Sequence, residues 1–286
     1  MSTLAHFLTD LFDEASLARR AYVVLRNYEG LPESNVGADI DLLIDRIDLG
    51  WFVNYISSRD YVKLTGFQER QYVATVFITG LSDVPCRSLQ IDLVTELAWK
   101  GMTYLEPRAV LNDCVRHRKG FQIPQPWHEA VISLFSSYLI GGWIKERYYS
   151  QVVETFATHR DEVVDTLSPT LGRRLAVRLA AAVGSNKKDE LHRLLPRIRR
   201  SLLLRSLGLR MPTVLGCMLR YWSCELRVRH TPASLVEVCL LGVDGAGKGT
   251  VIQQVLGRVG SRVKDVEVIH LRPFTGSRDS SRAVAP

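Results

Sequence analysis

Residues 37–44 read Gly-Ala-Asp-Ile-Asp-Leu-Leu-Ile, and this stretch decides how the first part of the chain folds. The apolar run from Ile40 to Ile44 predicts a strand that follows a turn-rich segment. Successive side chains of a strand point to opposite faces, so Asp39 and Asp41 share one face. A later strand is expected where Leu-Gln-Ile-Asp-Leu-Val places Asp92. The sequence therefore predicts acidic side chains on two strands.

The flanking pattern predicts an α+β domain over residues 1–125. Apolar residues at helical spacing indicate helices early in this domain, and runs of β-branched and aromatic residues indicate further strands. The expected helices cover residues 3–21 and 49–58, and the expected strands cover residues 22–25, 40–44, 72–79 and 89–94.

Residues 126–230 are helical in pattern almost throughout, which predicts an all-α segment. The apolar stretch 130–144 is expected to be a buried helix, because it is too short to span a membrane. Prolines interrupt the pattern and are expected to separate short helices. These prolines are Pro169, Pro196 and Pro212.

Positive charge is concentrated in this helical segment. Residues 171–230 hold 14 Lys and Arg against three acids, whereas the whole chain has a net charge of +7. Such a stretch is either a solvated helix face or a surface for phosphorylated ligands, nucleic acid or an anionic membrane. No motif indicates specific nucleic-acid recognition. No transmembrane span is expected.

Length and composition indicate a globular protein with more than one domain. The chain has 286 residues, of which 46% are hydrophobic and 23% charged, and this length suits two domains of ~100–200 residues each. The five cysteines are scattered and odd in number, as expected for reduced thiols. No secretory signal pattern opens the sequence. We therefore expect a cytoplasmic protein.

A phosphate-binding loop follows the helical segment. Residues 242–250 read Gly-Val-Asp-Gly-Ala-Gly-Lys-Gly-Thr, after an expected strand at residues 236–241 and before an expected helix at residues 251–259. This context is typical of a Walker A loop, in which backbone N–H groups and a lysine bind the phosphates of ATP. We assign nucleotide binding to Gly242, Asp244, Gly245, Ala246, Gly247, Lys248, Gly249 and Thr250, and a catalytic role to Lys248.

Gly249 stands where Walker A loops usually carry the Ser or Thr that binds Mg²⁺. The wording D-G-A-G-K-G-T resembles nucleoside monophosphate kinases of the adenylate and thymidylate type. That resemblance implies that Thr250 contacts the α-phosphate. Arg272, at the end of an expected strand at residues 266–269, resembles the arginine that thymidylate kinases use on the acceptor phosphate, or is an ordinary exposed arginine. Because 38 residues follow Lys248, we expect residues 231–286 to be an incomplete α/β P-loop domain of a longer parent chain.

The carboxylates of the first domain indicate a second kind of chemistry. Asp39, Asp41 and Asp92 can hold Mg²⁺ around a triphosphate for in-line transfer, or they are solvated acids at strand ends. The D-x-D pair with a later carboxylate resembles the polymerase-beta-type nucleotidyltransferases. We assign catalysis and metal binding to these three residues.

The sequence over most of the chain resembles a particular bacterial family, in which such a nucleotidyltransferase-like domain is joined through basic helices to a thymidylate-kinase-like domain. The matching segments are residues 24–27 (Val-Leu-Arg-Asn), 29–32 (Glu-Gly-Leu-Pro), 37–43, 91–93, 99–101 (Trp-Lys-Gly), 227–232 (Arg-Val-Arg-His-Thr-Pro) and 270–273 (His-Leu-Arg-Pro). Genes of that family often lie among those for surface polysaccharide synthesis. The resemblance implies ATP and Mg²⁺ as cofactors and a phosphorylated sugar or nucleotide as acceptor.

The chain departs from the pattern of these nucleotidyltransferases at the residues that usually bind the triphosphate. The Gly-Ser that usually precedes D-x-D is replaced by Arg26-Asn27. We assign Arg26 to phosphate binding, the alternative being an ion pair with a carboxylate. Three functions remain open: a phosphotransferase of the nucleoside-kinase type, a metal-dependent nucleotidyltransferase, or a nucleotide-binding module without catalysis.

Overall fold

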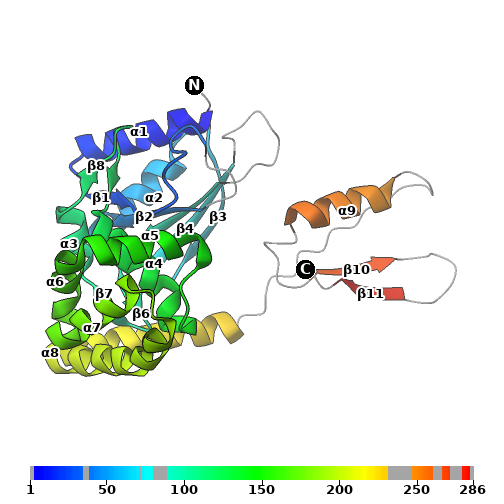
Figure 1. The fold of residues 1–286 in the computed structure, drawn as a ribbon. Coiled ribbons are helices and arrows are strands. Elements are labelled where there is room, and N and C mark those ends of the chain that lie inside the picture. Colours follow the sequence, from blue (N-terminus) through cyan, green and yellow to red (C-terminus); the bar gives the residue numbers. More distant parts are fainter. Residues whose placement is uncertain are drawn as a thin grey trace. The chain divides into compact units, whose positions relative to one another are not determined.

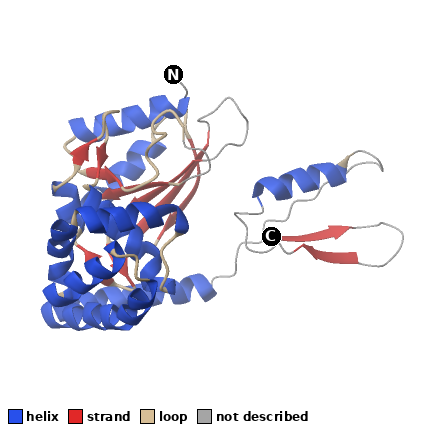
Figure 2. Ribbon diagram, viewed as in Figure 1, coloured by secondary structure: helices blue, strands red, loops and turns tan. Residues whose placement is uncertain are grey.

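The structure is a computed structural model that describes residues 3–34, 39–70, 72–79, 89–230, 247–259, 266–270 and 279–283. The chain divides into two compact units, Met1–Thr231 and Pro232–Pro286. The first unit is a mixed α+β structure (Figures 1 and 2), as the sequence predicts.

A five-stranded mixed sheet forms the centre of the first unit. Its strand order is β1-β2-β5-β4-β3, with β2 and β5 parallel and every other pair antiparallel. The strands are β1 (Tyr22–Val24), β2 (Ile40–Ile44), β3 (Lys63–Glu69), β4 (Val73–Thr79) and β5 (Leu89–Val94). The four strands predicted from the sequence are confirmed. The fifth, β3, was not predicted, because six of its seven residues are exposed and its two large apolar residues, Leu64 and Phe67, do not alternate with polar ones.

Two helices cover one face of this sheet (Figure 1). They are α1 (Thr3–Leu17) and α2 (Leu49–Ser57), which follows a short 3₁₀ helix (Arg46–Asp48). Phe7, Leu11 and Phe52 from these helices pack on Leu42 and Ile91 of the sheet in one fully buried cluster. Burial of the alternate strand residues on this face fixes which residues face the other way.

Five helices form a layer against the other face (Figure 1). They are α4 (Pro126–Gly141), α5 (Glu146–Thr158), α6 (Arg160–Leu171), α7 (Arg173–Gly184) and α8 (Lys188–His230). Val23 and Leu43 of the sheet belong to the same buried cluster as Leu134, Phe156 and Leu179 of the helices. The expected buried helix is confirmed as α4, which ends at Gly141 where Gly142 adopts a φ of 76°.

The prolines do not separate helices, contrary to the sequence prediction. Pro169 lies inside α6, and Pro196 and Pro212 lie inside α8. A proline removes one helical hydrogen bond. The helix nevertheless continues past Pro196, because Leu194 and Ile198 on either side of it are packed in the buried cluster. Tertiary packing therefore overrides the local preference.

Short elements connect the sheet to the helical layer. They are the hairpins β6 (Leu97–Trp99) with β7 (Met102–Leu105) and β8 (Val115–Arg116) with β9 (Gln122–Ile123), and the helix α3 (Pro107–Asn112). β7 contacts α6 and α8, and thereby joins the sheet region to the helices.

In the second unit the structure describes a helix and a hairpin. The predicted helix after the phosphate loop is confirmed as α9 (Lys248–Val259), and the predicted strand as β10 (Val266–His270). β10 pairs antiparallel with β11 (Asp279–Ala283). Residues 276–286 are rich in Ser and Arg, a composition that predicts disorder. That prediction is wrong for Asp279–Ala283, which form β11 and pair with β10. The expected strand at residues 236–241 lies outside the described residues.

Candidate functional site: carboxylates between the sheet and the helical layer

Three neighbouring strands place a row of polar side chains at one level of the sheet. Asp41 of β2 is in register with Asp92 of β5, and Thr75 of β4 is in register with Asp92. Residues in register on adjacent strands point to the same face. The sheet thus brings the two aspartates side by side, with a threonine next to them.

This face is less covered than the opposite one. Burial alternates along β4 and β5, with fully buried residues facing α1 and α2 and half-buried residues on the carboxylate face. Asp92 is half-buried, and Gln90 donates from Nε2 to both of its oxygens at 3.2 Å. A carboxylate with this partial exposure remains accessible to a ligand.

Burial raises the pKa of Asp92 above its ordinary value, and the charges of Asp41 and Asp39 raise it further, while hydrogen bonds from Thr75 and Gln90 act in the opposite direction. Asp39 is exposed and directly precedes β2. The three carboxylates singled out from the sequence therefore lie near enough to one another to interact electrostatically.

Arg26 is held by one of these carboxylates. Its Nε donates to Asp41 Oδ2 at 2.6 Å, and the two side chains are only 19% and 12% exposed. The structure thus shows the ion pair, the alternative to a phosphate contact. Binding of phosphate by Arg26 stays a prediction.

Helices α4 and α5 fix the segment that carries this arginine. The Tyr148 hydroxyl donates to Asn27 Oδ1 at 3.1 Å, and the Tyr28 hydroxyl donates to Glu129 Oε2 at 2.7 Å. Asn27 adopts a φ of 57°, a left-handed conformation that asparagine tolerates better than most residues. The helical layer therefore positions a loop of the sheet domain, from more than 100 positions away in the sequence.

Two cations near this ion pair were missed in the sequence analysis. Lys145 directly precedes α5, and burial together with the charges of Arg26 and Arg147 lowers its pKa, against an opposing effect of Asp41. Arg147 lies in the first turn of α5, with its guanidinium carbon 4.6 Å from the centre of the Tyr148 ring. The only indication of this turn in the sequence is the Gly141-Gly142 pair that precedes it, which is a weak signal.

The donor set at the carboxylates suits a hard divalent cation. Among the described residues, no group of three or more His, Cys, Asp or Glu side chains is arranged to hold a metal ion. Mg²⁺, however, is commonly bound through one or two carboxylates together with substrate phosphates and water. Asp41 and Asp92 can supply such a pair, and the mutual repulsion felt by Asp92 is what a cation would relieve.

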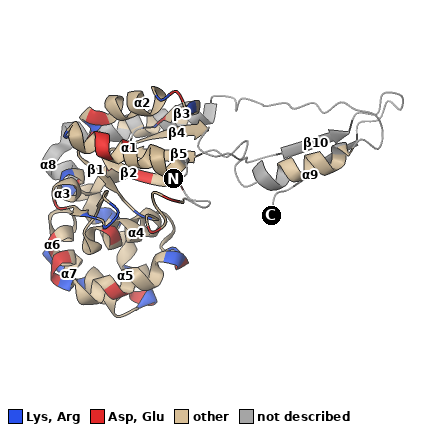
Figure 3. Ribbon diagram, turned by 90° about the horizontal axis from the view of Figure 1, so that it is seen from above, with Lys and Arg blue, Asp and Glu red and all other residues tan. Residues whose placement is uncertain are grey.

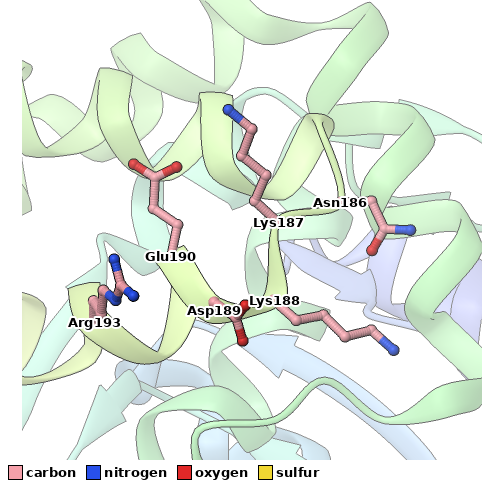
Figure 4. Close-up of a pocket in the computed structure, with 6 residues that line it drawn as sticks. All are labelled: Asn186, Lys187, Lys188, Asp189, Glu190 and Arg193. Carbon is pink, nitrogen blue, oxygen red and sulfur yellow. The ribbon is translucent and has the colours of Figure 1, made fainter.

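The described cavities lie elsewhere. A surface cavity of about 540 Å³ at the start of α8 is lined by Asn186, Lys187, Lys188, Asp189, Glu190 and Arg193, whose side chains point in several directions (Figure 4). Its lining mixes three cations with two acids and comes from one continuous segment. A second cavity of about 290 Å³ lies beside it, between α4, α5 and α8, and is lined in part by Trp143 and His192. Neither contains a site residue expected from the sequence, and we give the carboxylate row more weight because its residues converge from three strands.

Most of the phosphate loop lies outside the described residues, namely Gly242, Asp244, Gly245 and Ala246, and so does Arg272. The described part begins at Gly247, with a φ of 75°, and continues directly into α9 at Lys248, Gly249 and Thr250. Gly247 thus adopts the left-handed conformation that only glycine adopts readily.

Part of the positive charge in the helical segment has a structural use. Arg199 donates to the carbonyl oxygens of Leu139 and Ile140 at the end of α4, and Arg205 donates to those of Ser168 and Pro169 near the end of α6. These cations satisfy helix C-termini and complement their dipoles. The acids of α6 lie next to the arginines of α7 (Figure 3), and Arg173 pairs with Asp165 at the exposed surface, which favours a solvated surface there.

Comparison of the chain with protein-family models, with curated proteins and with solved structures finds no match. Within the described part of the chain, no helix has both the length and the apolar character needed to cross a membrane.

Proposed function

We propose that the first unit is a metal-dependent nucleotide-binding domain of the nucleotidyltransferase type, in which Asp41 and Asp92 hold Mg²⁺ with a bound nucleoside triphosphate. The observation that carries this proposal is the register of β2 with β5, which aligns these two aspartates. Asp39 adds negative charge at the exposed end of the row. A bound Mg²⁺ would neutralise phosphate charge as pyrophosphate leaves.

The reaction that fits is transfer of a nucleoside monophosphate to an acceptor oxygen, with release of pyrophosphate. The resemblance to a family linked to surface polysaccharides favours a phosphorylated sugar as the acceptor. The protein's own contribution would be to orient the triphosphate and to concentrate opposite charges in a half-buried site.

The test is a thermal melt of the full chain with ATP and millimolar Mg²⁺ or Mn²⁺. A ligand that binds only the folded state raises the melting temperature by mass action. Relative to ATP without metal, we expect a further rise that is lost in Asp41→Asn and Asp92→Asn and retained in Asp165→Asn, an aspartate that is 71% exposed. All variants should carry Lys248→Ala, which removes the contribution of the phosphate loop. Equal shifts in all of these proteins would contradict the proposal.

We propose as a second activity that the phosphate loop binds ATP, as part of a nucleoside-kinase-like phosphotransferase in a longer parent chain. The start of α9 at Lys248, directly after a left-handed Gly247, favours this proposal. In an Asp41→Asn, Asp92→Asn background, Lys248→Ala should weaken ATP binding by about 10-fold or more, whereas Lys187→Ala should leave it unchanged. Equal ATP affinity of the Lys248→Ala and Lys187→Ala variants in this background would refute the assignment of the loop.

A further inference from the structure

Two guanidinium groups from distant parts of the chain meet at one buried tyrosine. The Tyr148 ring is 6% exposed. The guanidinium carbon of Arg26 lies 5.7 Å from its centre and that of Arg147 lies 4.6 Å from it. Lys145 stands three positions before Tyr148, in the turn between α4 and α5. The fold therefore gathers three cations around one end of α5.

Protein acids balance only part of the charge of this group, because the acids that act on it are Asp41, near Arg26 and Lys145, and Glu129, near Arg26. Arg26 pairs with Asp41, but its Nη1 is buried without a hydrogen-bond partner. Neither Lys145 nor Arg147 forms an ion pair with any residue in the described ranges. Glu146 lies between them in sequence, but its side chain lines the cavity next to Lys188 and His192. Like charges held together without a counterion are unfavourable, so an anion would stabilise this arrangement.

The turn that presents these cations is tightly specified. Gly142 has a φ of 76°, and a Cβ atom at Gly141 would lie only 2.0 Å from Trp143 Nε1. The φ of Gly142 therefore favours glycine, and a side chain at position 141 would displace the Trp143 indole, which is 55% exposed. Gly142 also ends α4 by donating from its N–H to the carbonyl oxygen of Tyr138 at 2.9 Å. The direction in which the chain enters α5, and so the position of Lys145, follows from these two glycines.

We propose that Lys145 and Arg147 form, with Arg26, a binding site for the terminal phosphates of a nucleoside triphosphate. The proposal rests on the proposed function, because the site lies beside Asp41 of the carboxylate row. In this chain Arg26-Asn27 replaces the Gly-Ser pair expected before D-x-D. The proposal assigns phosphate binding to cationic side chains instead of to that Gly-Ser turn. The proposal also specifies a polyphosphate as the ligand. Lys145 and Arg147 have no ion-pair partner among the described residues, and free guanidinium and ammonium groups recognise phosphate oxygens rather than sugar hydroxyls.

The probe is inorganic tripolyphosphate, which has neither base nor sugar. Binding is measured by calorimetry at low salt, without divalent ions, on the full chain carrying Lys248→Ala. Adding Lys145→Ala and Arg147→Ala should weaken binding by about 10- to 100-fold, as expected for the loss of two charge-assisted contacts. The matched control removes the same two residue types from exposed positions, Lys187→Ala with Arg174→Ala, and should change affinity less than about 3-fold, as expected for distant surface charges.

A charge-conserving variant guards against a purely structural effect. Lys145→Arg with Arg147→Lys should retain most of the tripolyphosphate binding, whereas the alanine pair loses it. Equal binding by the alanine pair and by the matched control overturns the inference, and so does a Lys248→Ala chain that does not bind tripolyphosphate. Failure of the proposed function is seen separately, as Mn²⁺ binding without phosphate that does not depend on Asp41 or Asp92.

Discussion

Replacement of Arg26 by methionine tests how the site is held together. The change keeps the apolar stem beside Tyr148 and removes the charge opposite Asp41. Removing one partner of a buried ion pair costs about 3–5 kcal/mol, because the other charge is left without compensation. Arg26 and Asp41 keep 19% and 12% exposure, so we expect a cost of about 2–4 kcal/mol. For a unit of this size that corresponds to a fall in Tm of about 5–15 °C.

The assay is urea unfolding followed by tryptophan fluorescence. All five tryptophans, Trp51, Trp99, Trp127, Trp143 and Trp222, lie in the first unit, so the signal reports on that unit alone. Arg173→Met is the control, because Arg173 pairs with Asp165 at 3.5 Å on the surface and both side chains are more than 70% exposed. Such a pair contributes about 0–1 kcal/mol.

A double substitution separates loss of the charge pair from loss of packing. Arg26→Met with Asp41→Asn removes both charges and should recover most of the stability lost in Arg26→Met. Millimolar Mg²⁺ should likewise restore part of the stability of Arg26→Met, but not of the double variant, since only the former keeps the Asp41 carboxylate. The reasoning fails if Arg26→Met is as stable as the wild type, or if the double variant is no more stable than the single one.

Two further substitutions probe the carboxylate row and the helical layer. Asp92→Asn should stabilise the metal-free protein at pH 7, because the folded-state pKa of Asp92 is raised. This gain in stability should shrink as the pH falls and vanish below the ordinary aspartate pKa of about 3.9. Urea midpoints of the two proteins that differ by a constant amount between pH 3 and pH 7 would contradict this prediction. Tyr138→Phe should destabilise the first unit by about 1–2 kcal/mol, because the fully buried hydroxyl donates to the Leu191 carbonyl. The control is Tyr149→Phe, at a half-exposed position. Equal urea midpoints for the two variants would refute a stabilising role of the Tyr138 hydrogen bond.

The sequence predicted the parts of the fold that depend on local pattern. Runs of β-branched and aromatic residues identified β1, β2, β4 and β5, and alternation placed Asp39 and Asp41 on the same face of their strand. The edge strand β3 gave no such signal, because almost all of its side chains are exposed and its apolar residues do not alternate with polar ones. Pro196 lies inside α8, although proline usually ends a helix, because the packing of α8 outweighs that local preference.

The site could be predicted only in part, because its register and its cations are non-local. Side-chain alternation shows which face Asp92 occupies, but pairing with Asp41 depends on how β2 and β5 align across 50 residues. Lys145 and Arg147 lie near Arg26 only because the helices pack on the sheet. The local sequence pattern of either segment does not predict this proximity.

The central claim is that Asp41 and Asp92 bind a divalent cation. Its most direct test is a Mn²⁺ titration of the full chain carrying Lys248→Ala, with free Mn²⁺ followed by electron paramagnetic resonance. We predict one Mn²⁺ site per chain that ATP strengthens and that both Asp41→Asn and Asp92→Asn abolish, while Asp165→Asn leaves it intact. Mn²⁺ binding that is unchanged by Asp41→Asn and Asp92→Asn, or no Mn²⁺ binding even with ATP present, would contradict the claim.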